Sequence, residues 1–128
     1  MKKYSKDERD AFADQMRNRT KQFAVDTINL CNTLPSGRAY GTIVYQLVKS
    51  STSVGANYRA ACRARSGAEF HSKLSIVVEE SDESGYWLEV ILDLKTNCDL
   101  AEVERLRQES DEITRIVASA RSNTKRNK

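Results

Sequence analysis

Three arginines and a lysine, Arg59, Arg63, Arg65 and Lys73, lie close together in a segment that is almost free of acids. Residues 38–73 contain six basic side chains and a single acid, Glu69. A guanidinium group offers a planar fork of donors that matches phosphate oxygens, and a local group of such cations favours nucleic acid. The pattern therefore indicates phosphate binding, although a solvated basic helix face would produce the same pattern. We include Arg38, at the start of this segment, among the candidate nucleic-acid-binding residues.

Catalytic chemistry has little support in the same sequence. His71 is the only histidine, which excludes metal sites built from several histidines and leaves one residue for any nucleophile–histidine pair. Glu79, Glu80 and Glu83 share part of one helix surface, but the carboxylate di-iron sites of helix bundles need Glu-x-x-His from two helices. The glycines follow no phosphate-loop pattern and stand at positions 37, 41, 55, 67 and 85. We expect no enzymatic activity, no cofactor and no metal site.

Four blocks of helically spaced apolar residues must position these side chains, at about residues 5–34, 40–61, 67–91 and 100–120. Within each block the apolar positions step by threes and fours. Ser5-Lys6-Asp7-Glu8 and Ser66-Gly67-Ala68-Glu69 have the pattern of a capping box, and Asp99-Leu100-Ala101-Glu102 resembles a third start signal. Pro35-Ser36-Gly37 separates the first two blocks. Short connections make successive helices antiparallel neighbours. The sequence predicts an all-α protein, a single up-down-up-down antiparallel four-helix bundle over residues 1–128.

Two further groups of residues indicate how the helices pack: a run of small residues, and apolar residues that lie outside the main stripes. The run from Ser50 to Ala56 is made almost wholly of small residues, which favours close approach of a neighbouring helix over a ligand-binding loop. Further apolar residues widen the stripes beyond what one core needs, namely Val25, Ile28, Ile76, Val78, Val90 and Leu92. A second buried surface follows from these wide stripes, and we expect a homo-oligomer.

Charge is segregated along the chain, whose net charge is +3. Residues 74–94 contain six acids and no base, so an anionic helix follows the cationic one. Antiparallel pairing about a turn near residue 66 places Lys49 near Glu83 and Arg63 near Glu69, which predicts a ladder of ion pairs between the two helices. The end of the chain, residues 121–128, contains four bases and no acid. We expect a disordered tail there, in which Lys125 and Arg126 add non-specific phosphate contacts.

Tyr86-Trp87 is the remaining aromatic signal. Aromatic side chains stack on bases in single-strand binding proteins, but the position of Trp87 beside Leu88 favours packing at a helix or subunit boundary.

No run approaches the roughly 20 apolar residues that cross a bilayer, and no apolar signal region follows Met1-Lys2-Lys3. We therefore expect a cytoplasmic protein without membrane contact.

Several joined motifs resemble a known family. They are Arg19-Thr20-Lys21-Gln22-Phe23-Ala24, the run from Ser53 to Ser66 (SVGANYRAACRARS), Glu69-Phe70 with Lys73-Leu74, and the run from Glu79 to Glu89 with its Tyr86-Trp87-Leu88. Over about residues 17–95 the chain is similar to the four-helix-bundle family named for 23S rRNA intervening sequences. Members are encoded in some bacteria within insertions in the large-subunit ribosomal RNA gene. The resemblance implies a homopentameric barrel with a basic surface and no known catalytic activity.

Relatives of that family include the accessory variability determinant proteins of diversity-generating retroelements, which act beside a reverse transcriptase and its RNA. The resemblance and the basic segment together predict a non-enzymatic, oligomeric helical scaffold that binds RNA, with a reverse transcriptase or ribosomal RNA as its setting. The alternative is a protein–protein interaction adaptor whose nucleic-acid binding is incidental. No motif of the family falls in the fourth block, whose contacts stay unassigned.

Overall fold

The predicted start signals lie at the beginnings of the helices in the computed structural model, which describes residues 4–124. The helices are α1 (Lys6–Cys31), α2 (Arg38–Cys62), α3 (Gly67–Asp93) and α4 (Leu100–Ser122). The Ser5 hydroxyl accepts a hydrogen bond from the Glu8 backbone N–H at 3.1 Å, and the Glu8 carboxylate accepts one from the Ser5 N–H at 2.8 Å. This reciprocal pair is the expected capping box. Asp99 likewise caps α4 by accepting from the Glu102 N–H at 3.1 Å.

The start of α3 differs from the prediction in one contact. Ser66 accepts from the Glu69 N–H at 3.1 Å, as expected, but the Glu69 carboxylate accepts from the Arg65 backbone N–H at 2.6 Å. The side chain of Glu69 thus reaches one residue further back than a capping box requires and fixes the connection between α2 and α3. Helix α1 also ends earlier than predicted, because Cys31 is its last residue and Leu34 lies half-buried in the connection to α2.

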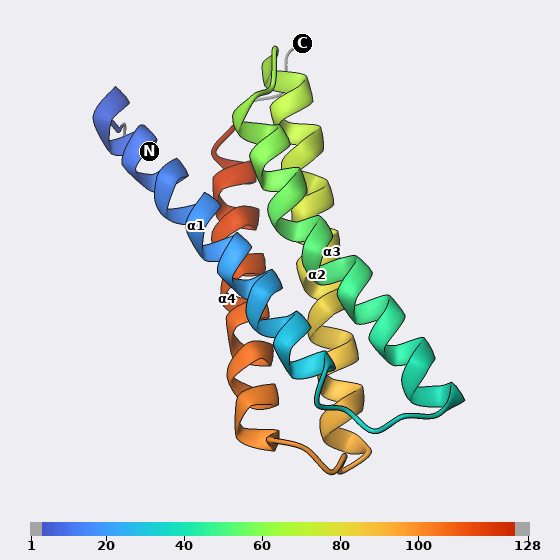
Figure 1. The fold of residues 1–128 in the computed structure, drawn as a ribbon. Helices are drawn as coiled ribbons and strands as arrows, with labels where there is room; N and C mark the ends of the chain where they lie inside the picture. Colours follow the sequence, from blue (N-terminus) through green and yellow to red (C-terminus); the bar gives the residue numbers. More distant parts are fainter. Residues whose placement is uncertain (1–3, 125–128) are drawn as a thin grey trace.

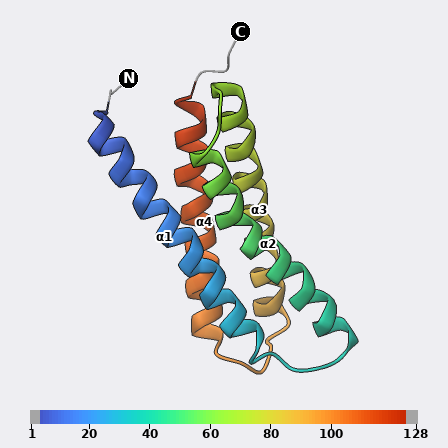
Figure 2. The same cartoon turned by 45° about the horizontal axis from the view of Figure 1, so that its top comes forward.

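The helices run alternately up and down and form the predicted four-helix bundle (Figure 1). The described residues contain no strand. Helices α3 and α4 lie side by side, whereas the N-terminal half of α1 and, at the other end of the bundle, the first turns of α2 diverge from them, as Figures 1 and 2 both show. Before Met16 no residue of α1 is buried. Phe12, which its spacing places on the core stripe, is therefore 39% exposed.

The core is mostly aliphatic, with Phe23 and Tyr58 as its buried aromatic side chains. Its fully buried large side chains include Phe23, Leu47, Leu74 and Ile113, one from each helix. These positions belong to the alternating stripes of three- and four-residue steps. None of the helices in residues 4–124 is long and apolar enough to cross a membrane.

Buried small residues bring α3 into close contact with both α2 and α4. The Ser84 hydroxyl donates to the Ser50 hydroxyl at 2.9 Å, which joins α3 to α2, and the hydroxyls of Ser81 and Thr114 lie 2.7 Å apart between α3 and α4. Gly85 packs so closely on α4 that an added Cβ would lie 2.8 Å from the Ser110 hydroxyl oxygen. Close packing is thus confirmed for the small residues near Ser50.

The C-terminal end of α4 corrects the predicted tail in part. Helix α4 continues through Ser122, so Arg121 and Ser122 are helical, and the Arg121 guanidinium donates to the Ser75 hydroxyl at 3.4 Å. This contact fixes the last turn of α4 against α3. Lys125 and Arg126 lie outside the described residues.

Substituting Gly85 by valine tests the close contact between α3 and α4. The added side chain would collide with Ser110, so we expect Gly85→Val to lower the free energy of unfolding by about 1–3 kcal/mol. Chemical denaturation followed by circular dichroism measures this change. Gly41→Val is the matched control, since a Cβ at Gly41 meets nothing within 4 Å. Equal stabilities of the two variants would contradict the close packing.

Candidate nucleic-acid interface

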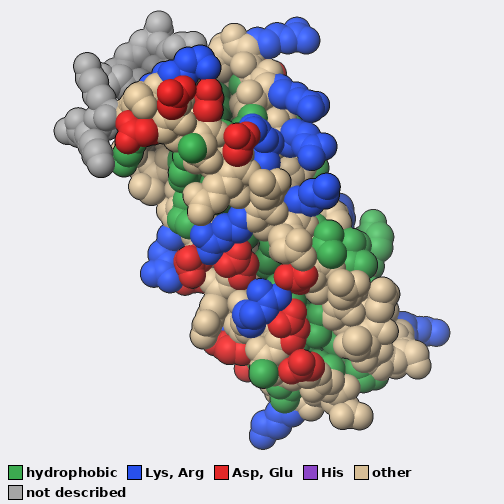
Figure 3. All heavy atoms as spheres, turned by 60° about the vertical axis from the view of Figure 1, so that its left-hand side comes forward, with side chains coloured by type: hydrophobic (Ala, Val, Ile, Leu, Met, Phe, Trp, Pro, Cys, Tyr) green, Lys and Arg blue, Asp and Glu red, His purple; other side chains and the backbone are tan. Residues whose placement is uncertain are grey.

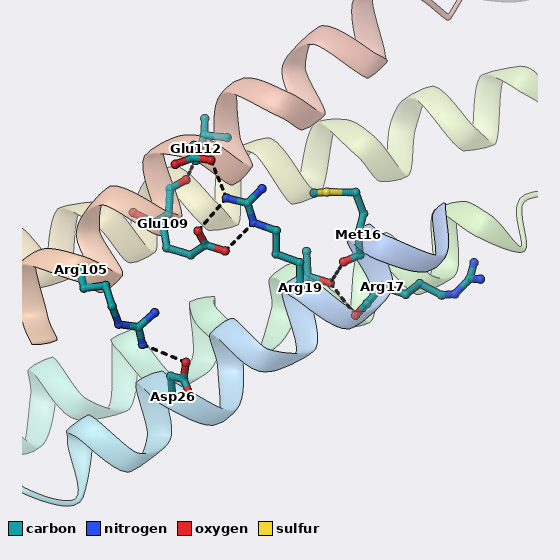
Figure 4. Close-up of polar contacts among 10 residues, drawn as sticks. Met16, Arg17, Arg19, Asp26, Arg105, Glu109 and Glu112 are labelled. Atoms are coloured by element: carbon teal, nitrogen blue, oxygen red, sulfur yellow. Dashed lines mark hydrogen bonds and ion pairs between the residues drawn. The ribbon is translucent and has the colours of Figure 1, made fainter. Parts of the chain in front are cut away.

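All ion pairs found among residues 4–124 lie on α1 and α4. Most join residues three or four apart on one helix. Two arginines reach across between helices: Arg19 of α1 contacts Glu109 at 2.6 Å and Glu112 at 2.7 Å, and Arg105 of α4 contacts Asp26 at 2.9 Å. We call the group of Arg19, Glu109, Glu112, Arg105 and Asp26 the clamp, and Figure 4 shows its side chains pointing toward one another. The arginines of α1 and α4 that make these pairs are thus already neutralised.

The clamp holds α1 on the bundle below the point where α1 diverges. Arg19 is bidentate to Glu109, with a second contact at 2.8 Å, and its side chain is 26% exposed. Hydrogen bonds to Glu109 and then Glu112 raise the pKa of the Arg19 guanidinium. A hollow of about 360 Å³ lies between α1 and α4 beside this clamp, and Phe23 and Leu106 contribute its apolar lining. Because its arginines are paired, the hollow is a weak candidate for binding phosphate.

The cations at the junction of α2 and α3 have a different environment. Arg59 lies in the last turn of α2, Arg63 is its C-cap, Arg65 stands in the connection and Lys73 lies near the start of α3. The three arginines are exposed and Lys73 is half-buried. Within residues 4–124, none of the four side chains makes an ion pair or a hydrogen bond. We call these four residues the basic end.

The bundle brings the basic end together because α2 ends where α3 begins, at the top of Figure 1. Lys and Arg side chains gather along the upper right edge of Figure 3, whereas acids and bases mix over much of the rest of that view. Arg59 and Arg63 also have a structural role, because they lie at the C-terminus of α2, where the helix dipole stabilises positive charge. That interaction leaves the guanidinium donors free for phosphate.

The predicted ladder of ion pairs between α2 and α3 is wrong. Both helices are fully described, and no ion pair joins them. Glu69 binds the Arg65 backbone, so it does not neutralise Arg63. Lys49 is exposed. Burial raises the pKa of the Glu80 carboxyl, and the charges of Glu83 and Glu79 raise it further. The positive charge of Lys49 lowers this pKa but does not outweigh the other effects.

Two groups of predicted site residues are not part of the basic end. Arg38 begins α2, and a helix of 25 residues is about 36 Å long, so Arg38 lies at the opposite end of the bundle. Lys125 and Arg126 fall outside the described residues, but the contact of Arg121 with Ser75 shows that α4 ends beside the basic end.

Arg17, a further cation near the basic end, is not among the residues that the sequence predicted for the site. Arg17 of α1 lies beside Cys62, whose thiol, followed by the carboxylate of Asp14, raises the pKa of its guanidinium. Arg17 also pairs with Asp14 on its own helix. No sequence signal marks Arg17, because its position depends on how α1 crosses α2. Among residues 4–124 no group of three or more histidine, cysteine or carboxylate side chains could hold a metal ion.

Comparison with known proteins gives a family and a solved structure. The model of the family described as 23S rRNA-intervening sequence protein matches residues 13–119. A crystal structure at 1.70 Å from Bacteroides thetaiotaomicron VPI-5482, of a protein with unknown function from the S23 ribosomal protein family, is similar. Its sequence is 31% identical, with a TM-score of 0.74 over 82% of this chain and 96% of that one. No curated protein matches the chain.

Substituting Arg19 tests whether its ion pairs with Glu109 and Glu112 stabilise the bundle. We expect Arg19→Gln to lower the free energy of unfolding by about 1 kcal/mol at low salt, because Glu109 and Glu112 lose their shared partner. High salt should shrink the difference, since it screens partly exposed pairs. Chemical denaturation at two salt concentrations measures both effects. Lys21→Gln is the control, because Lys21 is an exposed residue of the same helix that makes no ion pair within the described part of the chain. An equal loss there would contradict a stabilising role for Arg19.

Proposed function

Because the chain belongs to the 23S rRNA-intervening sequence protein family, we propose that it is a non-enzymatic helical scaffold that binds RNA through its basic end. The proposed setting is the bacterial cytoplasm, in association with ribosomal RNA or with a reverse transcriptase and its RNA. Assembly as a homo-oligomer, a pentamer by resemblance, is part of the same proposal.

The unpaired state of Arg59, Arg63, Arg65 and Lys73 carries this proposal. Elsewhere on the bundle, arginines such as Arg19, Arg105, Arg107 and Arg115 are held by carboxylates. A cation that is already paired must lose its partner before it can bind phosphate, whereas the basic end incurs no such cost. The cations of the basic end would bind an RNA backbone by releasing its counterions.

The basic end favours the phosphate backbone over the bases. Tyr86 and Trp87 lie in the C-terminal half of α3, far along the helix from Lys73. The two rings contact each other edge to face, with centroids 5.0 Å apart, and the Trp87 indole N–H donates to Glu83 at 3.2 Å. No large aromatic side chain among residues 59–73 is exposed. Binding should therefore depend on charge and spacing, without sequence readout.

A protein–protein adaptor is the second candidate function. Tyr45 is 63% and Tyr86 57% exposed, and such aromatic residues are enriched at protein interfaces. Affinity purification with and without nuclease separates the two functions. A partner protein that stays bound after digestion favours the adaptor, whereas loss of all partners on digestion favours RNA binding.

Neutralising the basic end tests the RNA proposal directly. The triple variant Arg59→Gln, Arg63→Gln, Arg65→Gln should bind a labelled structured RNA more weakly. Its log affinity should depend less steeply on log salt, by roughly one unit per lost phosphate contact. Fluorescence anisotropy across a salt series measures both quantities.

A matched control removes the same charge elsewhere. The variant Arg9→Gln, Lys21→Gln, Arg115→Gln neutralises three exposed cations of α1 and α4 and should retain most of the affinity. If both triple variants lose affinity equally, net charge is responsible and the basic end is not the site. Unchanged binding by the Arg59, Arg63 and Arg65 variant would also reject the proposal.

A further inference from the structure

Helix α2, which runs from the basic end to the opposite end of the bundle (Figure 1), carries one row of exposed residues along its length. The exposed positions recur at steps of three and four from residue 38 to residue 63, so they share one face of the helix. At about 1.5 Å per residue, the row is about 38 Å long. We call it the α2 stripe, and its charged and aromatic members are Arg38, Tyr45, Lys49, Arg59 and Arg63.

The α2 stripe is cationic and contains no acid. Helix α2 has no Asp or Glu, and within residues 4–124 the four cationic side chains of the stripe make no ion pair or hydrogen bond. Lys49 lowers the pKa of Glu80 on α3, but the two side chains form no ion pair. Residues 74–94, most of α3, contain six acids and no base, which repel phosphate. A polyanion bound to the stripe is therefore directed along α2 and away from α3.

An apolar hollow lies in the stripe beside Tyr45. The Tyr45 side chain is 63% exposed, more than any other large hydrophobic residue in the described part of the chain. Val44 and Val48 lie half-buried next to it. A shallow hollow of about 410 Å³ is lined by these three residues together with Gly41 and Lys49. Gly41 leaves the hollow open, because even a Cβ there would meet nothing within 4 Å. The stripe thus combines cations with an accessible aromatic ring.

We propose that this hollow binds an unpaired base of an RNA strand, stacked on the Tyr45 ring, while the phosphates of the strand follow the cations of the α2 stripe to the basic end. The inference rests on the proposed function, to which it adds a second subsite and a class of ligand, single-stranded RNA. Proteins that bind single strands combine a positively charged track for the backbone with aromatic side chains on which bases stack. The α2 stripe supplies the track, and Tyr45 supplies the aromatic ring.

The spacing of the side chains along α2 suits one strand. Lys49 stands one helical turn from Tyr45, about 6 Å along the axis, where it can meet the phosphate of the nucleotide whose base is stacked. Arg38 lies about 11 Å from Tyr45 in the other direction, and Arg59 lies about 21 Å away at the basic end. Cations therefore stand on both sides of the ring, and a strand that continues in either direction stays beside positive charge.

A duplex does not fit the same surface. Its bases stack on one another and leave no free face for Tyr45, and proteins bind double-stranded RNA mostly through its shape and backbone. The stripe is one row wide and lies next to the acidic α3, which would repel a second strand. The favoured ligand is therefore a loop, a bulge or a free end of RNA. Because every base has a π-face, stacking on Tyr45 adds affinity without sequence readout.

Fluorescence anisotropy with two labelled RNAs tests the subsite: an oligouridylate, which forms no duplex with itself, and an RNA duplex of equal length. Tyr45→Ala should weaken binding of the oligouridylate at least about fivefold, the lower range for a base stacked on an aromatic residue, and should leave duplex binding unchanged. Tyr45→Phe should bind as the natural protein does, because stacking uses the ring and not the hydroxyl. The matched control Tyr86→Ala removes a tyrosine that is 57% exposed on the acidic α3 and should keep the natural affinity for both RNAs.

The salt dependence of the same binding tests the phosphate track. Lys49→Gln should lower the slope of log affinity against log salt for the oligouridylate by about 0.7, the value for one contact to a single strand. Tyr45→Ala removes no charge and should leave this slope unchanged. An unchanged slope for Lys49→Gln would reject a track that passes Lys49.

Photocrosslinking locates the bound base directly. An oligouridylate that contains 5-iodouridine should crosslink to Tyr45 on irradiation, and mass spectrometry of the digested protein identifies the modified peptide. Natural affinity of Tyr45→Ala for the oligouridylate, an equal loss for both RNAs, or a crosslink found only at other residues would each overturn the subsite. A nuclease-resistant protein partner that Tyr45→Ala loses while it keeps its RNA affinity would assign the hollow to the adaptor function instead.

The subsite and the basic end can fail separately. If the Arg59, Arg63 and Arg65 variant binds both RNAs more weakly while Tyr45→Ala changes neither, the basic end stands and the subsite fails. If Tyr45→Ala selectively loses the oligouridylate while the arginine variant binds as the natural protein does, the basic end is rejected and the subsite stands. A natural protein that binds neither RNA would reject both.

Discussion

The close packing of α3 against α2 and α4 determines where the charged side chains of these helices lie. Buried serines and Gly85 replace bulky residues at the contacts, and the Ser84–Ser50 and Ser81–Thr114 hydrogen bonds satisfy the hydroxyl groups. Each of these hydroxyl groups also lies within hydrogen-bond distance of a backbone carbonyl of its own helix. The contacts between helices therefore favour one register without being the only partners of these groups. The heights of Lys49, Glu83 and the basic end follow from this register.

The helix pairs α1–α4 and α2–α3 differ in whether their charged side chains form ion pairs. Helices α1 and α4 contain all the ion pairs found among residues 4–124, between the two helices through Arg19 and Arg105 and otherwise within each helix. Helices α2 and α3 are joined by apolar and hydroxyl contacts, and their charges face outward without ion pairs. One helix pair thus stabilises the bundle electrostatically, while the other leaves its charges exposed. This division explains why a chain of small net charge can present a strongly basic end.

The fold was largely predictable, and the charge pairing was not. Alternating steps of three and four residues, with caps at Ser5, Ser66 and Asp99, located all four helices to within a few residues. The ladder between Lys49 and Glu83 failed because antiparallel register fixes height but not the direction in which a side chain points. Arg17 was missed for a related reason, since its place beside Cys62 depends on the crossing of α1 over α2.

The sequence alone determined the four helices, their antiparallel order and the segregation of bases in residues 38–73 from acids in residues 74–94. These features depend on local spacing, capping residues and short connections, which are written in neighbouring positions. Tertiary structure alone decided which cations are free. Arg19 and Glu109 are 90 residues apart and meet only because α1 folds onto α4, whereas Arg63 and Glu69 are close in sequence and do not pair. Pairing needs a shared direction in space, and that direction is set by helix packing.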